Sequence, residues 1–260
     1  MVSILLHSSK SMRLASPADH SYQQPPFLNH AEKIDSYLKS LSIHALQDVM
    51  KLSEKKATET HDLIASWTSD QSKQQPAIDA FLGDIYSGLQ VASLDDDDRQ
   101  YANSHLFILS GLYGLLRALD SIHPYRLEMG YRLPDDPYKN LEFFWSDKLA
   151  SALPSNDPIV NLSAVEYTKA LLPYVNKTVV TPKFLTRNTN SGEPTFVTVH
   201  AKIARGAFAH WMIARRITSL DDLSSFDELH YCYDKTLSTD FEPVFVCDQF
   251  GGIGMSVRLT

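Results

Sequence analysis

The sequence predicts an α/β protein in which short strands alternate with helices. Three short and mainly apolar runs, each followed by polar residues, are typical of buried strands: Val2–Leu6, Leu106–Leu109 and Ile159–Leu162. The stretches between them repeat apolar residues at the spacing of amphipathic helices. Because no internal repeat or linker divides the chain, its 260 residues are expected to form a single domain, residues 1–260.

Composition and charge limit the function. The chain is 43% hydrophobic and 21% charged, which excludes collagen-like, low-complexity and wholly disordered proteins. It has 24 Lys and Arg residues and 31 Asp and Glu residues, so its formal charge is −7. Nucleic-acid binding would therefore require a local basic cluster, because the overall charge gives no attraction to phosphates.

The N-terminal residues, the longest apolar stretch and the cysteines together predict a cytoplasmic protein without membrane contact. The first residues have no positive segment like that of a signal peptide, and the most apolar stretch, Ile108–Leu119, contains Ser110 and Arg117. Cys232 and Cys247 have no metal-type spacing, which fits a reducing compartment. Buried structural cysteines are expected, and a peroxide-reactive thiol is the alternative.

The first half of the chain predicts a loop followed by helices. Ser16–Pro26 is rich in Ser, Pro and Gln, which favours an exposed loop. Three helical patterns follow: Ala31–Leu41, Ile43–Leu52 and Ala57–Trp67. The acidic run Asp95–Asp98 favours a helix start, where one side chain caps the backbone and the other carboxylates face the positive end of the dipole. A metal site is the alternative for this run.

Two turns that contain glycines follow. Gly83 and Gly88 predict a tight backbone path. The strand that ends at Leu109 continues into a Ser-Gly turn and then a helical pattern over Leu115–Leu119. A strand, a glycine turn and a helix present backbone N–H groups to an anion, so Ser110 and Gly111 are candidate anion ligands. The alternative is that the glycines only allow close packing.

The segment Tyr125–Arg132 alternates in polarity with period two. This alternation places Arg126, Glu128 and Arg132 on one side of an extended segment. A solvated face with salt bridges is the default interpretation, and a functional face would require that side to line a cleft.

The segment after residue 178 predicts a hairpin and a helix. The hairpin consists of two strands and a turn: Val179–Leu185, 186–194 and Phe196–Val199. If the alternation continues, His200 and Lys202 share one strand face. A helix is predicted over Ile203–Arg216, with Lys202 and Arg205 at its amino end, where cations are unfavourable unless an anion lies between them. Neutralisation by acidic side chains elsewhere is the alternative.

Several catalytic motifs are lacking in the sequence. No H-E-x-x-H, zinc-finger, G-x-S-x-G or P-loop pattern occurs, so a zinc enzyme, a serine hydrolase and a P-loop ATPase are unsupported. No cofactor and no metal ion is predicted.

Several strings resemble those of the YaaA family of bacterial peroxide-stress proteins. The match runs in order over nearly the whole chain, through these stretches: Ala80–Gln90, Leu109–Arg117, Pro124–Gly130, Phe144–Trp145, Asn161–Tyr167 and Ala201–Gly206. The resemblance implies a cytoplasmic single-domain α/β protein, with a mixed sheet flanked by helices, a positively lined cleft and a helix-hairpin-helix element. It also implies DNA binding and protection against peroxide by limiting free iron and oxidative DNA damage.

This chain departs from the family strings at three places. His7-Ser8-Ser9-Lys10 replaces Ser-Pro-Ala-Lys, Leu82 replaces a lysine, and Ala118 replaces a proline. Two of these changes fall in the expected cleft, so the resemblance leaves the identity of the ligand open.

Two functional hypotheses follow. The first is a DNA-binding stress protein whose helix-hairpin-helix maps to Ile43–Trp67 and which contacts phosphates without sequence preference. Its candidate residues for binding DNA or another anion are Lys10, Lys51, Lys55, Lys56, Ser110, Gly111, Arg126, Arg132, Lys202 and Arg205.

The second hypothesis is an enzyme or binder that takes a phosphorylated or nucleobase-like small molecule in the same cleft. Its candidate acid, base and cationic residues are Asp84, Glu128, Glu166, His200 and Lys202. The sequence leaves open whether any reaction is catalysed and which oligomeric state the protein adopts.

Overall fold

The computed structural model describes residues 1–13, 23–70 and 74–252. Most of the loop predicted over Ser16–Pro26 lies outside these residues. The central sheet has the strand order β6-β5-β1-β8-β9 and is mixed, as predicted. Its strands are β1 (Ser3–His7), β5 (Leu106–Ser110), β6 (Gly114–Arg117), β8 (Ile159–Asn161) and β9 (Val179–Val180).

Strand β1 lies in the middle of this sheet and is buried along its whole length. It pairs in parallel with β5 on one side, with Leu5 opposite Phe107, and with β8 on the other side. A strand with parallel neighbours on both sides is expected to be apolar, which is why Val2–Leu6 and Leu106–Leu109 were recognisable in the sequence. The polar residues after β1 and β8 therefore emerge at the same edge of the sheet.

The helix predicted over Leu115–Leu119 is wrong. Gly114 adopts φ +72° and closes a tight turn after β5, and the chain returns as the antiparallel strand β6. An added Cβ on Gly114 would lie 2.8 Å from the Trp145 ring, so glycine is required there by both conformation and space. The strand, turn and helix expected for an anion site are instead a β-hairpin.

A second sheet has the order β11-β10-β13-β12. It contains β10 (Lys183–Arg187), β11 (Pro194–Thr195), β12 (Cys232–Tyr233) and β13 (Val244–Cys247). A hairpin is present here, because β10 and β11 pair antiparallel, but its predicted bounds are wrong. The predicted strand Val179–Leu185 is divided between β9 of the central sheet and β10, and the returning strand β11 precedes the predicted Phe196–Val199, where α10 begins.

The strand predicted through Lys202 is wrong, because helix α10 covers Thr198–Ala214. The alternation from Phe196 to Lys202 that favoured a strand also fits the start of a helix, and the buried residues at helical spacing over the 17 residues of α10 outweigh it. Ala201, Ala204 and Phe208 lie on the buried face of α10.

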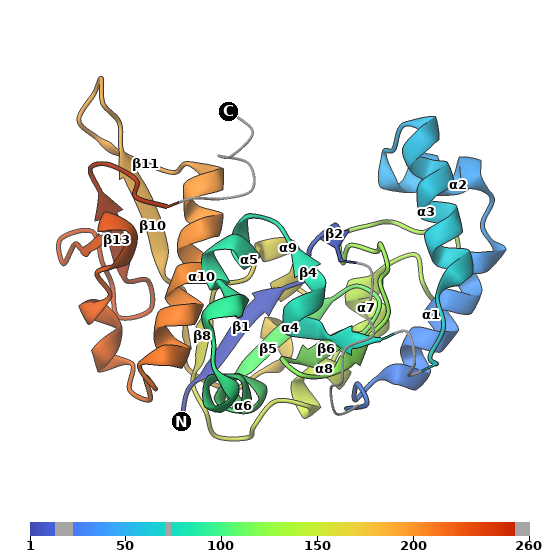
Figure 1. Ribbon diagram of the computed structural model, residues 1–260, viewed down its shortest axis with the longest axis horizontal. Helices are drawn as coiled ribbons and strands as arrows, with labels where there is room; N and C mark the ends of the chain where they lie inside the picture. The colour runs from blue at the N-terminus through green and yellow to red at the C-terminus, as the bar shows by residue number, and fades with distance from the viewer. Residues whose placement is uncertain (14–22, 71–73, 253–260) are drawn as a thin grey trace.

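Helix α10 crosses α5 (Asp84–Leu89) at two glycines. An added Cβ on Gly206 would lie 1.8 Å from the Ile85 carbonyl oxygen, and one on Gly88 would lie 2.0 Å from the Ile203 carbonyl oxygen. The two helices therefore touch backbone to backbone, and this contact joins the second sheet to the central one (Figure 1).

Three helices form an arm at the other end of the molecule (Figure 1). They are α1 (Leu28–Ser40), α2 (Ile43–Met50) and α3 (Glu54–Ser66), which agree with the three predicted helices to within a few residues. Ser42 and Ser53 cap α2 and α3 through their side chains, and Lys51 ends α2 in the left-handed conformation. A connection of only three residues joins α2 to α3.

The remaining elements are short, apart from α6. Asp95 accepts a hydrogen bond from the Asp98 N–H at 2.8 Å and caps α6, which confirms the helix-start interpretation of the acidic run. The elements are β2 (Ser11–Met12), β3 (Gln75–Pro76), α4 (Ala77–Ala80), β4 (Phe81–Leu82), η2 (Val91–Ser93), α6 (Asp96–His105), β7 (Ser121–Ile122), α7 (Leu141–Trp145), α8 (Lys148–Ser151), α9 (Val165–Thr168), η3 (Leu172–Tyr174), η4 (Asp221–Ser225) and η5 (Glu228–His230).

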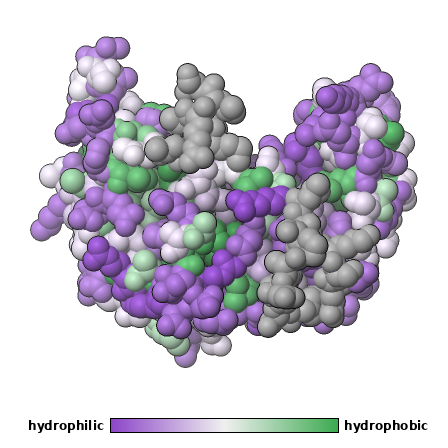
Figure 2. All heavy atoms as spheres, in the orientation of Figure 1, coloured by the Kyte–Doolittle hydropathy of each residue, from purple (hydrophilic) through white to green (hydrophobic). Residues whose placement is uncertain are grey.

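No helix in the described part of the chain combines the length and the apolar character that crossing a membrane would need. The space-filling view shows a molecule with two raised ends, the helical arm and the β10–β11 hairpin, and a hollow between them (Figure 2).

Candidate functional site

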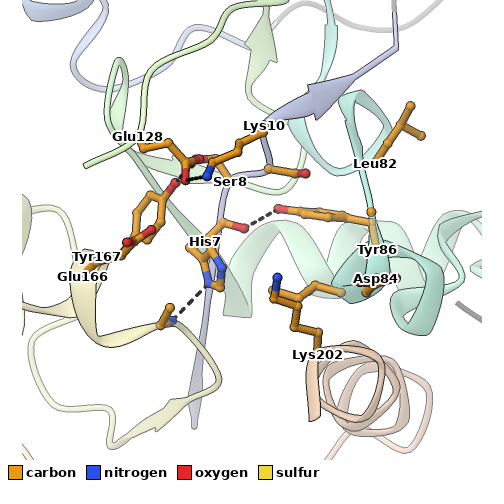
Figure 3. Close-up of a pocket in the computed structure, with 14 residues that line it drawn as sticks. His7, Ser8, Lys10, Leu82, Asp84, Tyr86, Glu128, Glu166, Tyr167 and Lys202 are labelled. Carbon is orange, nitrogen blue, oxygen red and sulfur yellow. Dashed lines mark hydrogen bonds and ion pairs between the residues drawn. The ribbon is translucent and has the colours of Figure 1, made fainter. Parts of the chain in front are cut away.

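A cavity of about 390 Å³ opens at the carboxyl end of β1. Five parts of the chain meet there: the loop after β1, the start of α5, the extended segment around residue 128, the start of α9 and the first turns of α10 (Figure 3). Ligands in open α/β sheets bind at this edge, where loops that follow neighbouring parallel strands converge. We call this cavity the mixed-charge pocket, because acidic and basic side chains both line it.

His7 lies at the base of the mixed-charge pocket. Its Nδ1 accepts a hydrogen bond from the Ala164 N–H at 3.1 Å, and its ring stacks on Tyr167 with 4.7 Å between ring centroids. Burial, together with the positive charges of Arg205 and Lys202, lowers the pKa of His7 to about 3. The imidazole is therefore neutral, and because Nδ1 accepts, its proton is on Nε2.

Acidic side chains form one end of the pocket. The Tyr167 hydroxyl donates to Glu128 Oε1 at 2.9 Å, and Lys10 Nζ lies 3.3 Å from Glu128 Oε2. Glu166 also lines the pocket, and partial burial, followed by the nearby Glu128 charge, raises its pKa. Asp84, the first residue of α5, lines the opposite side of the pocket, beside Lys202 (Figure 3).

Cationic side chains approach from α10. Lys202 lines the pocket, and Arg205, one turn further along, is close enough for its charge to lower the pKa of His7. Burial lowers the pKa of the Arg205 guanidinium itself. Within the part of the chain that the structure describes, neither side chain makes an ion pair with an acid. Of the acidic neutralisation considered for these two cations, the described residues show one contribution, because the charge of Lys202 acts on the Glu166 carboxyl in the same pocket.

A second cavity, of about 300 Å³, lies between α3 and the extended segment before residue 127. Lys10, Lys56 and Arg126 line it, together with Glu59, and we call it the basic pocket. Lys56 pairs with Glu59 at 2.8 Å, and Arg126 donates from Nη1 to the Lys10 carbonyl oxygen at 3.3 Å. The Nε of Arg126 is buried without a hydrogen-bond acceptor among the described residues. Lys10 lines both pockets.

Several candidate residues lie away from both pockets. Ser110 is fully buried, where its hydroxyl accepts from the Tyr113 N–H at 2.9 Å and bonds with the Tyr125 hydroxyl at 2.6 Å. Gly111 lies where an added Cβ would be 2.6 Å from the Leu127 carbonyl oxygen, so it serves close packing. As buried residues, these two cannot meet an anion from solvent, which contradicts their proposed role.

Other candidates are exposed or engaged elsewhere. Arg132 lies 3.9 Å from Glu142 in an ion pair outside the pockets. His200 hydrogen-bonds with Thr186 at 2.8 Å and stacks on Phe250, because α10 turns it toward the second sheet rather than the cavity. Lys51 and Lys55 are exposed at the α2–α3 connection.

The departures from the family strings lie in two different environments. His7, Ser8, Ser9 and Leu82 all line the mixed-charge pocket, whereas Ala118 is buried in the core. His7 and Tyr167 were not predicted as site residues. His7 is the last residue of β1, and Tyr167 lies in α9, in the segment that follows β8. The carboxyl ends of these two strands were the available signal, because they share one edge of a parallel sheet.

Comparison with known proteins covers nearly the whole chain. The family described as "Peroxide stress protein YaaA" matches residues 2–237. A UPF0246 protein of Salinispora tropica is 50% identical over 256 residues, which cover 98% of this chain and 97% of the relative. A UPF0246 protein of Roseobacter denitrificans is 39% identical over 232 residues, 86% of this chain and 90% of the relative. The chain therefore belongs to the YaaA family of peroxide stress proteins.

Proposed function

We propose that this protein protects DNA during peroxide stress by binding the DNA backbone in the hollow between the helical arm and the β10–β11 hairpin. The observation that carries the proposal is the basic pocket, in which Lys56 of the arm meets Lys10 and Arg126 of the sheet edge. Cations from separate elements that converge on one cavity are suited to hold a phosphate. The hydrogen bond from Arg126 Nη1 to the Lys10 carbonyl oxygen holds the guanidinium there.

The arm supports the same proposal. The α2–α3 connection exposes Lys51 and Lys55, and the first turn of α3 has free backbone N–H groups at the positive end of its dipole. We infer that this pair of helices acts as a helix-hairpin-helix element that holds one phosphate without reading bases. The overall charge of −7 makes such local contacts necessary for any binding to DNA.

The proposal extends to oxidative damage. A protein bound along DNA limits the access of iron and peroxide to the bases, and in this family we expect it to act together with a reduction of free iron. Among the described residues no group of three or more His, Cys, Asp or Glu side chains could hold a metal ion.

The test is salt-dependent binding of a random-sequence duplex by the full chain. We expect the Lys55→Glu/Lys56→Glu variant to bind at least about 10-fold more weakly at low salt, because two cations near phosphates are replaced by anions. The slope of log affinity against log salt concentration should fall by about 2. Fluorescence anisotropy measures both quantities.

Lys235→Glu is the matched control, because Lys235 is exposed and lines neither the basic pocket nor the mixed-charge pocket. Its single charge reversal should change affinity much less than the double variant does. Absence of duplex binding by the folded wild type at low salt, or equal affinity of wild type and double variant, would overturn the proposal.

A second candidate function is favoured by the mixed-charge pocket. Its volume of about 390 Å³ suits a small ligand, and it combines carboxylates, cations and a neutral imidazole. We infer an enzyme or binder of a phosphorylated or nucleobase-like compound as the alternative. A thermal-shift screen of such compounds tests it, and failure of every compound to raise the melting temperature would count against it.

A further inference from the structure

We propose that the mixed-charge pocket binds one unstacked nucleotide of the bound DNA, and that it prefers a base with an exocyclic amino group. The inference rests on the proposed DNA binding for its context. Three features of the described residues carry it: donors gathered at one end of the pocket, acceptors at the other, and a lysine shared with the basic pocket.

The donor end is built from α10 and β1. Lys202 lines the cavity, Arg205 lies close to His7, and the Nε2–H of His7 is the free donor of a ring whose Nδ1 is already engaged. Neither cation makes an ion pair with an acid among the described residues, although the charge of Lys202 acts on Glu166 across the pocket. Beside a neutral N–H donor, the two cations form a site for an anion. A nucleotide phosphate supplies that anion.

The acceptor end is built from the segment around residue 128 and from α9. Glu128 already accepts from Tyr167 and pairs with Lys10, so its position is fixed. Glu166 makes no hydrogen bond or ion pair with another described residue, and it lies beside Glu128 with both oxygens available to accept. Carboxylates accept from the amino group of cytosine and present no donor to the carbonyl oxygen of thymine at the same ring position.

The size and position of the pocket favour a single nucleotide rather than a duplex. A cavity of about 390 Å³ is the size of a small-ligand site, and the ring of Tyr86 with the side chain of Leu82 gives it an apolar wall (Figure 3). Because Lys10 lines both pockets, a backbone held in the basic pocket brings the adjacent nucleotide to the mouth of the mixed-charge pocket. Proteins that read an unstacked base do so by hydrogen bonds to its edge in such a cavity.

The experiment compares three duplexes by anisotropy: fully paired, with one unpaired cytosine, and with one unpaired thymine. We expect the cytosine duplex to bind about 10-fold more tightly than the thymine duplex, the scale of one good base contact. Glu166→Ala should abolish this difference. Asp240→Ala, which removes one exposed negative charge outside the pocket, should retain the difference. In parallel, thermal shift compares dCMP with dTMP.

The outcomes separate this inference from the proposed function. A cytosine preference that Glu166→Ala removes supports the inference. If all duplexes bind but cytosine and thymine are equivalent, the inference is overturned and DNA binding stands. If no duplex binds, yet dCMP raises the melting temperature more than dTMP and Glu166→Ala cancels that difference, the nucleotide pocket stands and the proposed function falls. If no duplex binds and the two mononucleotides act alike, both are overturned.

Discussion

Replacing Gly206 with alanine is expected to lower the free energy of unfolding by about 3 kcal/mol or more. The added methyl group would lie 1.8 Å from the Ile85 carbonyl oxygen and 2.7 Å from the Leu89 nitrogen. Both are backbone atoms of α5, so no side-chain rotation can relieve the overlap, and overpacking of this kind costs at the upper end of its usual range. The helices α5 and α10 would have to separate.

The same change should damage the candidate site. Asp84 and Tyr86 lie on α5, whereas Lys202 and Arg205 lie on α10, so separation of the two helices pulls the walls of the mixed-charge pocket apart. Any ligand of that pocket should bind more weakly to Gly206→Ala even at temperatures where the variant remains folded.

Urea unfolding followed by circular dichroism measures the effect. Gly130→Ala is the matched control, because its added Cβ would make only ordinary contacts, the nearest at 3.5 Å from Glu166. We expect its unfolding free energy to lie within about 0.5 kcal/mol of the wild type. Equal stabilities for Gly206→Ala and the wild type would show that the backbone contact between α5 and α10 is not present in solution.

Asp120 is expected to make the protein less stable as pH rises from about 4.5 to 7. Its side chain is fully buried, and although Arg117 donates to both of its oxygens, burial prevails and raises its pKa to about 6. The folded state therefore holds this proton more tightly than the unfolded chain, whose aspartates titrate near 4. Stability is greatest when the group is protonated in the folded protein and falls as pH rises through the folded pKa.

The comparison with Asp120→Asn isolates this contribution. Between pH 4.5 and 7 the wild type should lose about 2 kcal/mol of unfolding free energy relative to the variant, which cannot ionise. Chemical unfolding at several pH values in one buffer series measures the difference. His7, whose pKa is lowered, titrates in both proteins, and its contribution cancels in the comparison. Parallel stability curves for the two proteins over this range would refute the expected titration of Asp120.

The elements that could be predicted from sequence are those whose signal is local. The strands around Leu5 and Ile108 have apolar runs that only a fully buried strand requires. The three helices of the arm have helical periodicity, and α2 and α3 also have capping serines. The segments after Gly111 and Phe196 were assigned wrongly because their short patterns fit either a helix or a strand. Packing against residues that are distant in the sequence, such as Trp145 beside Gly114, decided between a helix and a strand.

The residues of the candidate site divide in the same way, into those with a local sequence signal and those placed by distant contacts. Lys10, Glu128 and Glu166 could be identified because each lies at or near a predicted strand end or on an alternating segment. His200 was misplaced because one wrong assignment of secondary structure turns a side chain to a different face.

The sequence alone determined the family, the mixed α/β character and the residue types available for the site, because these depend on composition, local periodicity and contiguous motifs. Only the tertiary structure decided that Lys10 is shared by two pockets, that Ser110 is buried, and that Lys202 and Arg205 approach His7. These relations join residues up to about two hundred positions apart, and they arise from helix and strand packing that no local pattern encodes.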